Sequence, residues 1–209
     1  MRKIFCLETE WVQSVHSLKS SSSALSILDF LQNSDKRISF IFRNVATKED
    51  FNFYINHLYY DSYSSFDTVY LCFHGSKSSI SLASGDDINI MDFARENQGI
   101  FEGKNVHFGC CSTLNIGEEK AKEFKRLTKA RMITGYSKDV PFIESFIFEL
   151  WLLNVMVNHP EYGAIRIKDI AEKQMGYYVE KSEYAVTSNE LKNQFDIPIQ
   201  LFLSCIGYQ

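Results

Sequence analysis

The chain has 209 residues, which is enough for one domain with a sizeable hydrophobic core. Hydrophobic residues make up 45% of it, with 17 Phe and 11 Tyr, and this composition excludes an intrinsically disordered protein. The formal net charge is −4, and no cluster of Lys and Arg with interleaved aromatic residues is present, so nucleic acid is not an expected partner. No internal boundary stands out, and we expect a single domain over residues 1–209.

Membrane insertion and secretion are not expected either. The first apolar stretch stops at Glu8, and no small-residue cleavage site follows it. The most apolar helical segment, residues 143–157, is too short to cross a bilayer and carries Glu144 and Glu149. The five cysteines are an odd number, and several lie inside apolar runs, which is not the pattern of a disulfide framework. We therefore expect a protein of the reducing cytoplasm.

Strand and helix patterns alternate along the first third of the chain. They predict strands at residues 3–7 and 38–45 and a helix at residues 24–32, whose apolar positions are Leu25, Leu28, Phe30 and Leu31. The serines at 20–23 before that helix are expected to form a loop and a helix cap. Thr47 precedes Lys-Glu-Asp50, a variant of the capping box, and predicts a helix that runs to about residue 60.

The middle of the chain continues the alternation. Residues 68–73 are apolar on both faces, which is typical of a central parallel strand. Residues 79–82 and 87–90 alternate with period two around Ser84-Gly85-Asp86 and predict a hairpin. Further segments follow: a helix at 91–97, a strand at 105–109, a helix at 117–128, a strand at 131–134 and an apolar helix that Pro141 opens and that ends near 157.

Repeated β-α-β units with short connections predict an α/β fold with a mainly parallel, doubly wound sheet. Its core is expected at about residues 3–157. A C-terminal elaboration at about 158–209 would contain a helix at 165–176 and a final strand at 197–203, where Pro198 favours an edge position.

Two of the apolar strands end in reactive groups. The strand at 68–73 is followed by His74-Gly75, and the strand at 105–109 by Cys110-Cys111-Ser112. If these strands are parallel neighbours, an imidazole and a thiol emerge side by side at the carboxyl edge of the sheet, where open α/β folds place their sites. A thiol beside an imidazole is the minimum equipment for nucleophilic acyl transfer.

The motifs Cys72-Phe-His74-Gly75 and Gly109-Cys110-Cys111-Ser112-Thr113, in this order and strand context, resemble those of the caspase-like cysteine peptidases (clan CD), in particular the CHAT-like family. The resemblance covers roughly residues 3–157, including the hairpin between the two motifs. It implies a caspase-like three-layer α/β/α sandwich with a mainly parallel central sheet and a small β-hairpin insertion. It also implies a cysteine endopeptidase that cleaves a protein substrate.

The resemblance assigns a role to each motif. Cys111 would be the nucleophile, since the thiolate is the reactive form of cysteine. His74 would orient or deprotonate it and protonate the leaving amine. Backbone N–H groups of Gly75 and Cys111 are the natural donors of an oxyanion hole. No third acid is evident, and we expect a Cys-His dyad that uses neither a metal ion nor a cofactor.

Substrate choice is less defined. Several relatives cut after basic residues with the help of an acid near the nucleophile, but Gly109 stands where metacaspase-like members have Asp. The candidate acids are Asp139, Asp86 and Asp87. Ser112 is a further candidate to contact the substrate, although Ser112 and Thr113 also suit the shaping of the turn.

Alternatives to this interpretation stay open. Cys110 competes with Cys111, and only the family pattern favours Cys111. A metal site of His74, His107, Cys110 and Cys111 ranks low, because adjacent cysteines lack the spacing of zinc knuckles. His107 is instead expected to be a packed or partly exposed histidine. The chain is otherwise a catalytically silent, caspase-like interaction module.

The resemblance also implies a biological setting. Compact CHAT-like peptidases of prokaryotes commonly act as effectors of antiviral defence, held inactive until a sensor or regulatory protein releases them. A protein substrate and such a regulatory partner are therefore expected. The segment from residue 177 to 209 is a candidate for the switching.

Overall fold

The computed structural model describes residues 1–9 and 22–180 of the chain. Its strands are β1 (Arg2–Thr9), β2 (Ile38–Val45), β3 (Thr68–Cys72), β4 (His74–Ser76), β5 (Ser79–Ser81), β6 (Asp87–Asn89), β7 (Asn105–Gly109) and β8 (Met132–Gly135). Its helices are α1 (Ala24–Ser34), α2 (Lys48–Ile55), α3 (Ile90–Glu96), α4 (Glu118–Thr128), α5 (Phe142–Asn158) and α6 (Ala164–Glu180), with 3₁₀ turns at η1 (Asn56–Tyr59) and η2 (Asp61–Tyr63).

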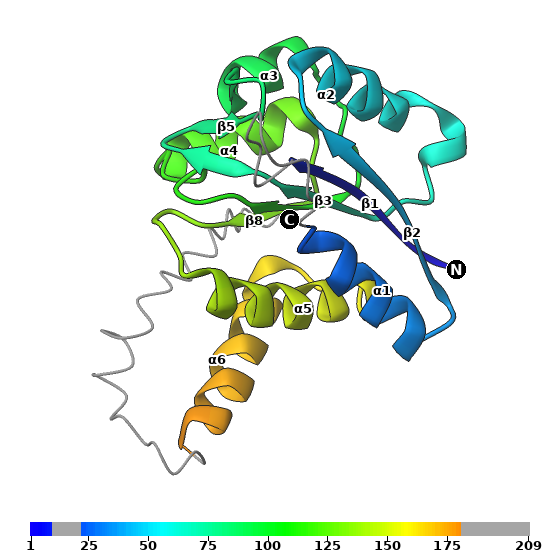
Figure 1. The fold of residues 1–209 in the computed structure, drawn as a ribbon. Helices are drawn as coiled ribbons and strands as arrows, with labels where there is room; N and C mark the ends of the chain where they lie inside the picture. Colours follow the sequence, from blue (N-terminus) through cyan, green and yellow to red (C-terminus); the bar gives the residue numbers. More distant parts are fainter. Residues whose placement is uncertain (10–21, 181–209) are drawn as a thin grey trace, which may run out of the picture.

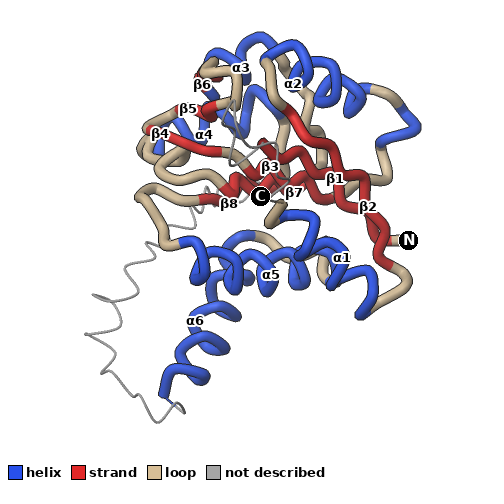
Figure 2. Tube along the Cα trace, in the orientation of Figure 1, coloured by secondary structure: helices blue, strands red, loops and turns tan. Residues whose placement is uncertain are grey.

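Five strands form the central sheet in the order β2-β1-β3-β7-β8, and every neighbouring pair is parallel. Three short strands, β4, β5 and β6, form a second, antiparallel sheet. Figures 1 and 2 show α1 and α5 against one face of the central sheet, with α2, α3 and α4 against the other. The fold is therefore mixed α/β with a mainly parallel sheet, as the sequence predicts.

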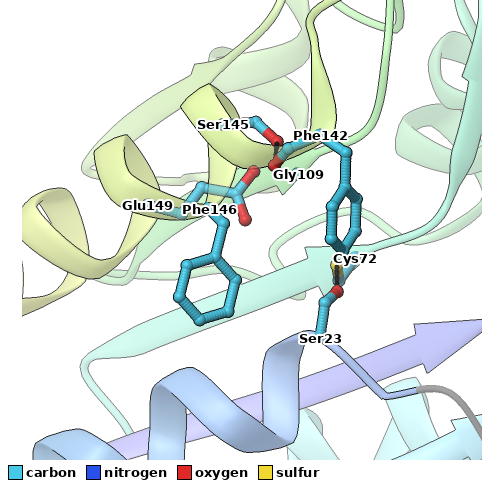
Figure 3. A pocket seen from close by; sticks show the side chains of 7 residues that line it. All are labelled: Ser23, Cys72, Gly109, Phe142, Ser145, Phe146 and Glu149. Carbon is cyan, nitrogen blue, oxygen red and sulfur yellow. Dashed lines mark hydrogen bonds between the residues drawn. The ribbon is translucent and has the colours of Figure 1, made fainter.

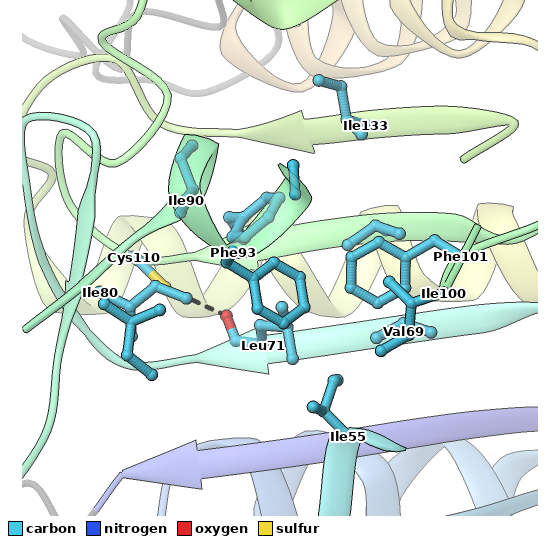
Figure 4. Packing of buried hydrophobic residues seen from close by; sticks show 14 of the residues in the cluster. Ile55, Val69, Leu71, Ile80, Ile90, Phe93, Ile100, Phe101, Cys110 and Ile133 are labelled. Atoms are coloured by element: carbon cyan, nitrogen blue, oxygen red, sulfur yellow. Dashed lines mark hydrogen bonds between the residues drawn. The ribbon is translucent and has the colours of Figure 1, made fainter. Parts of the chain in front are cut away.

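Alternate residues of the central strands supply the two halves of the core. Leu71 of β3 and Phe108 of β7 belong to the cluster packed under α2, α3 and α4 (Figure 4). Tyr70 and Cys72 of β3 point the other way, into the cluster under α1 and α5. Because every second side chain faces the same side of a strand, both faces must be apolar in a sheet covered on both sides.

Side chains satisfy the free N–H groups at the starts of α1 and α2. Thr47 Oγ1 accepts a hydrogen bond of 3.2 Å from the N–H of Asp50 at the start of α2, which confirms the predicted cap. The start of α1 is capped differently: the buried carboxylate of Glu8, at the end of β1, accepts from the N–H groups of Ser23 and Ala24 at 2.9 Å each. Ser22 of the serine run also caps this helix, since its Oγ accepts from the N–H of Leu25 at 3.0 Å, so the expected serine cap forms together with a strand carboxylate.

Several expected elements differ in detail. Phe30 is 59% exposed, and the buried side of α1 is formed by Ala24, Ile27, Leu28 and Leu31, so the expected apolar positions of this helix were partly wrong. The helix predicted to reach residue 60 ends at Ile55 and continues as 3₁₀ turns. The predicted hairpin forms as β5 and β6, but β4 adds a third strand that the sequence did not indicate. The strand expected at 197–203 lies outside the described residues.

The described part of the chain contains no helix that is both long and apolar enough to cross a bilayer. Cys6, Cys72, Cys110 and Cys111 are free thiols. No group of three His, Cys, Asp or Glu side chains within residues 1–9 and 22–180 is placed to hold a metal ion.

Candidate functional site

The two motif-bearing strands are direct neighbours. β3 and β7 pair in parallel, and Cys72 lies opposite Gly109 at the carboxyl end of both strands. His74 follows two residues after Cys72, and Cys111 two residues after Gly109. Both motifs therefore leave the sheet at the same edge, and His74 opens β4 of the small antiparallel sheet.

Gly75 packs directly on the turn that carries Cys111. A Cβ atom built at Gly75 would lie 2.3 Å from the carbonyl oxygen of Cys111, 2.3 Å from Oγ1 of Thr113 and 2.9 Å from Cβ of Cys110. These separations are shorter than any real Cβ contact, so only glycine fits here. The residue next to His74 is thus in van der Waals contact with the backbone of Cys111.

The two adjacent cysteines have different environments. Cys110 is 1% exposed and its thiol lies 3.2 Å from the carbonyl oxygen of Leu71, to which it donates (Figure 4). Burial raises the pKa of the Cys110 thiol far above its ordinary value. Cys111 is half-buried and retains access to solvent. Burial therefore disfavours a thiolate at Cys110, and Cys111 is the one of the two thiols that solvent can reach.

The turn after Cys111 is held by hydrogen bonds that its own residues donate to two neighbouring segments. Thr113 Oγ1 lies 3.0 Å from the carbonyl oxygen of Ser79 and donates to it, which joins the turn to β5. Ser112 adopts a left-handed conformation with φ of 56°, donates its N–H to the carbonyl oxygen of Lys138 at 3.1 Å and its hydroxyl to Asp139 Oδ1 at 2.7 Å. The strand-end loop after β8 therefore fixes the turn from the other side.

The three candidate acids differ in whether they contact the turn that carries Cys111. Asp139 reaches the turn through Ser112, and its carboxylate is exposed. Asp86 and Asp87 lie on the β5–β6 hairpin, where they accept hydrogen bonds from Ser84 and Ser81 at 2.7 and 2.6 Å. The hairpin carboxylates thus have local partners, and Asp139 is the candidate that a hydrogen bond joins to the turn after Cys111.

His107 is a packed residue, as expected. Its ring is fully buried and stacks on Tyr70 with a centroid distance of 5.6 Å. Nδ1 lies 2.9 Å from Thr134 Oγ1, while Nε2 has no hydrogen-bond partner and lies 3.7 Å from Oε1 of Glu149. This histidine is therefore directed into the layer beneath α5 and not toward the thiol of Cys111.

Sequence reasoning missed the group that His107 faces. Glu149 is 5% exposed, and its carboxylate accepts hydrogen bonds from the hydroxyls of Tyr70 and Tyr136, the latter at 3.0 Å. Burial is the main cause that raises the pKa of both tyrosines, and the negative charge of Glu149 adds to it in each case. The available signal was Glu149 at the centre of a mostly apolar helical run, because an acid that is buried there needs polar partners.

A small cavity of about 30 Å³ lies beside this carboxylate, between α5, the start of α1 and the ends of β3 and β7 (Figure 3). Its lining residues are Ser23, Cys72, Gly109, Phe142, Ser145, Phe146 and Glu149. It has room for one or two water molecules or the end of one side chain, and is far smaller than the roughly 300–1,000 Å³ of cofactor sites. The strand ends that lead to His74 and Cys111 therefore also form the wall of an acidic cavity.

Comparison with known proteins gives a family without an assigned activity. A search of the curated proteins returned no match. A family model matches the chain over residues 1–178, which include β1 to β8 and most of α6. The chain belongs to this family, described as "Family of unknown function (DUF6642)".

Proposed function

We propose that the protein is a cysteine endopeptidase of the caspase-like, CHAT-like type, with Cys111 as the nucleophile and His74 as its acid–base partner. The observation that carries the proposal is the contact between Gly75 and the Cys111 turn, where a Cβ atom would lie 2.3 Å from the Cys111 carbonyl oxygen. This contact supports a fixed spacing between His74 and Cys111. A fixed spacing is the geometric requirement for a nucleophile and its base.

The same residues suggest how the reaction would run. The Cys111 thiol gives its proton to His74, and the thiolate attacks the carbonyl carbon of the scissile peptide bond. Backbone N–H groups of Gly75 and Cys111 are the proposed donors to the oxyanion of the tetrahedral intermediate. The intermediate collapses to a thioester as His74 protonates the leaving amine. Water, deprotonated by His74, then releases the acid product and restores the thiol.

The finer fold assignment is part of the proposal. Helices on both faces of the parallel sheet, and a small antiparallel sheet inserted after β3, support a caspase-like three-layer sandwich with a hairpin insertion. The free thiols of Cys6, Cys72, Cys110 and Cys111 support a reducing, cytoplasmic setting. A regulated role in antiviral defence, with a sensor or regulatory protein partner and a protein substrate, rests on the family resemblance alone.

Labelling with peptidyl acyloxymethyl ketone probes, read by intact mass, tests the dyad. We expect labelling of the wild type and of Cys110→Ala, and its loss in Cys111→Ala and His74→Ala. Cys110→Ala is the matched control, because it removes an adjacent thiol that is already buried. Labelling that persists in Cys111→Ala contradicts the assignment of the nucleophile.

New chain termini in cells that express the wild type, compared with the Cys111→Ala variant, would identify the protein substrate. An unchanged set of termini, together with full biological activity of Cys111→Ala, would instead identify a catalytically silent interaction module.

A further inference from the structure

The cavity beside Glu149 has the composition of a site for a cation on an apolar stem. Phe142 and Phe146 of α5 lie on its wall, and Figure 3 shows their rings with the Glu149 carboxylate around the space next to the strand ends. Ser23 and Ser145 add two hydroxyl groups to the lining. Aromatic rings suit the methylene stem of a long basic side chain, and carboxylate and hydroxyl oxygens suit its charged end.

Glu149 has acceptor capacity left for such a cation. A carboxylate offers about four lone-pair positions, and the hydroxyls of Tyr70 and Tyr136 occupy one on each oxygen. Within the described residues, the one basic group that lies within 4 Å of this carboxylate is His107, whose Nε2 is 3.7 Å away without a hydrogen bond. A buried carboxylate held only by neutral donors gains from a cationic partner.

A second carboxylate adds to the negative potential of the cavity. Glu8 accepts hydrogen bonds from Ser23, one of the lining residues, at 2.9 and 3.0 Å. Burial is the largest cause that raises the pKa of Cys72, a lining residue of the cavity, and the charges of Glu149 and Glu8 are the next largest. Two acids therefore contribute to the negative potential at the cavity wall: Glu149 in the lining and Glu8 behind Ser23.

The cavity lies at the reach of one long side chain from the candidate dyad. Gly109 and Cys72 line it, and each precedes a dyad residue by two positions, which is about 7 Å of extended chain. The missing side chain at position 109 keeps the cavity clear, since a Cβ atom there would lie 3.1 Å from Glu149 Oε1 and 2.8 Å from Tyr70 Cε2. Only an unbranched side chain of several carbons spans this distance and still places a charge at Glu149.

We propose that this cavity receives the ammonium end of a lysine side chain of the substrate, at the residue whose carbonyl carbon Cys111 attacks, with Glu149 as the acceptor of the ammonium group. This inference rests on the proposed peptidase function and names its substrate class. Lysine fits better than arginine, because the ammonium is a compact point charge with three donors, and a cavity of about 30 Å³ has no room for a planar guanidinium. Glu149 thereby takes the specificity role for which Asp139, Asp86 and Asp87 were the candidates.

The test uses the full chain and a set of acyloxymethyl ketone probes that differ only in their last residue: lysine, Nε-acetyl-lysine, arginine or leucine. We expect Cys111 to react with the lysine probe about 30-fold faster than with the acetyl-lysine probe, since acetylation keeps the stem and removes the charge. Equal rates for these two probes on the wild type overturn the inference without any variant. A faster rate for arginine than for lysine overturns the choice of lysine.

Variants locate the acceptor. In Glu149→Gln the preference for lysine over acetyl-lysine is expected to fall to about threefold or less, because glutamine keeps the shape of the side chain but not its charge. Asp139→Asn is the matched control, and its lysine preference is expected to remain at the wild-type ratio. Retention of the full preference in Glu149→Gln, or its loss in Asp139→Asn alone, overturns the role of Glu149.

The outcomes separate this inference from the proposed function. Iodoacetamide carries no side chain to recognise, so its reaction with Cys111 in Glu149→Gln reports whether the thiol and the fold are intact. If none of the probes labels Cys111 in the wild type, the peptidase function fails and the inference fails with it. If all probes label Cys111 at the same rate, the peptidase function stands and the lysine pocket alone is overturned.

Discussion

Gly75→Ala is the substitution that most directly tests how the candidate dyad is held together. Ordinary van der Waals contact of a Cβ atom begins at 3.4 Å, whereas a Cβ at position 75 would lie 2.3 Å from the Cys111 carbonyl oxygen and from Thr113 Oγ1. The added methyl group is therefore about 1 Å too close to two atoms. One of them is backbone, so no rotation of a side chain can relieve the overlap.

The expected cost follows from the overlap. Overpacking of a tight contact costs about 1–3 kcal/mol, and the backbone contact places this variant near 3 kcal/mol. For a chain of this length, such a loss lowers the melting temperature by about 6–12 °C. A shift of about 1 Å between β4 and the Cys111 turn would also separate His74 from the thiol. Misplacement on this scale is expected to slow peptidyl probe labelling of Cys111 about 100-fold.

Gly163→Ala is the matched control. No heavy atom lies within 4 Å of a Cβ built at Gly163, and its φ is not in the left-handed region. We expect a change in the free energy of unfolding of no more than about 1 kcal/mol and an unchanged labelling rate. Urea denaturation and probe kinetics, run in parallel, measure both quantities. The reasoning is refuted if Gly75→Ala unfolds within about 0.5 kcal/mol of the wild type and labels Cys111 at the same rate.

Three further predictions concern stability. Burial raises the pKa of the Cys6, Cys72 and Cys110 thiols. Above pH ~8.5 the unfolded chain therefore releases protons that the folded chain keeps, and the free energy of unfolding falls as the pH rises. Between pH 8.5 and 9.5 the three thiols are expected to lower the free energy of unfolding by about 3 kcal/mol, and the lowered pKa of Lys104 offsets at most ~1.4 kcal/mol of this loss. A urea midpoint that stays constant over this pH range would contradict the prediction. Thr47→Ala is expected to cost about 1 kcal/mol in the same assay, because the cap of α2 is lost, and no change would argue against that cap. Asp139→Ala removes one exposed hydrogen bond to Ser112 and should cost less than about 1 kcal/mol; a larger loss of thermal stability would mean that Asp139 holds the turn.

Much of the fold could be predicted from local patterns. The order of strands and helices up to α5, the cap at Thr47 and the β5–β6 hairpin are each encoded within short stretches of sequence. The neighbouring placement of β3 and β7 was a condition of the site prediction, and the parallel pairing of the two strands meets it. β4 could not be predicted, because its three residues form a strand only by pairing with β5. Phe30 was expected on the apolar side of α1 but is exposed, because a helical pattern alone does not show which apolar side chains the sheet and the neighbouring helices cover.

The sequence by itself determined which chemical groups end the two central strands: an imidazole at His74 and a thiol pair at Cys110 and Cys111. Local periodicity is sufficient for this, since it defines each strand and hence each strand end. Only the tertiary structure decided that Cys110 is buried against β3 while Cys111 keeps access to solvent.

The tertiary structure also decided the surroundings of Glu149. In the sequence it is one of two acids on a mostly apolar helix, 79 residues away from Tyr70. In the fold these two residues share a hydrogen bond, next to a cavity bounded by the ends of β3 and β7. Such a site depends on contacts between distant segments, and the free energy of burying a carboxylate is decided by those contacts and not by its neighbours in the chain.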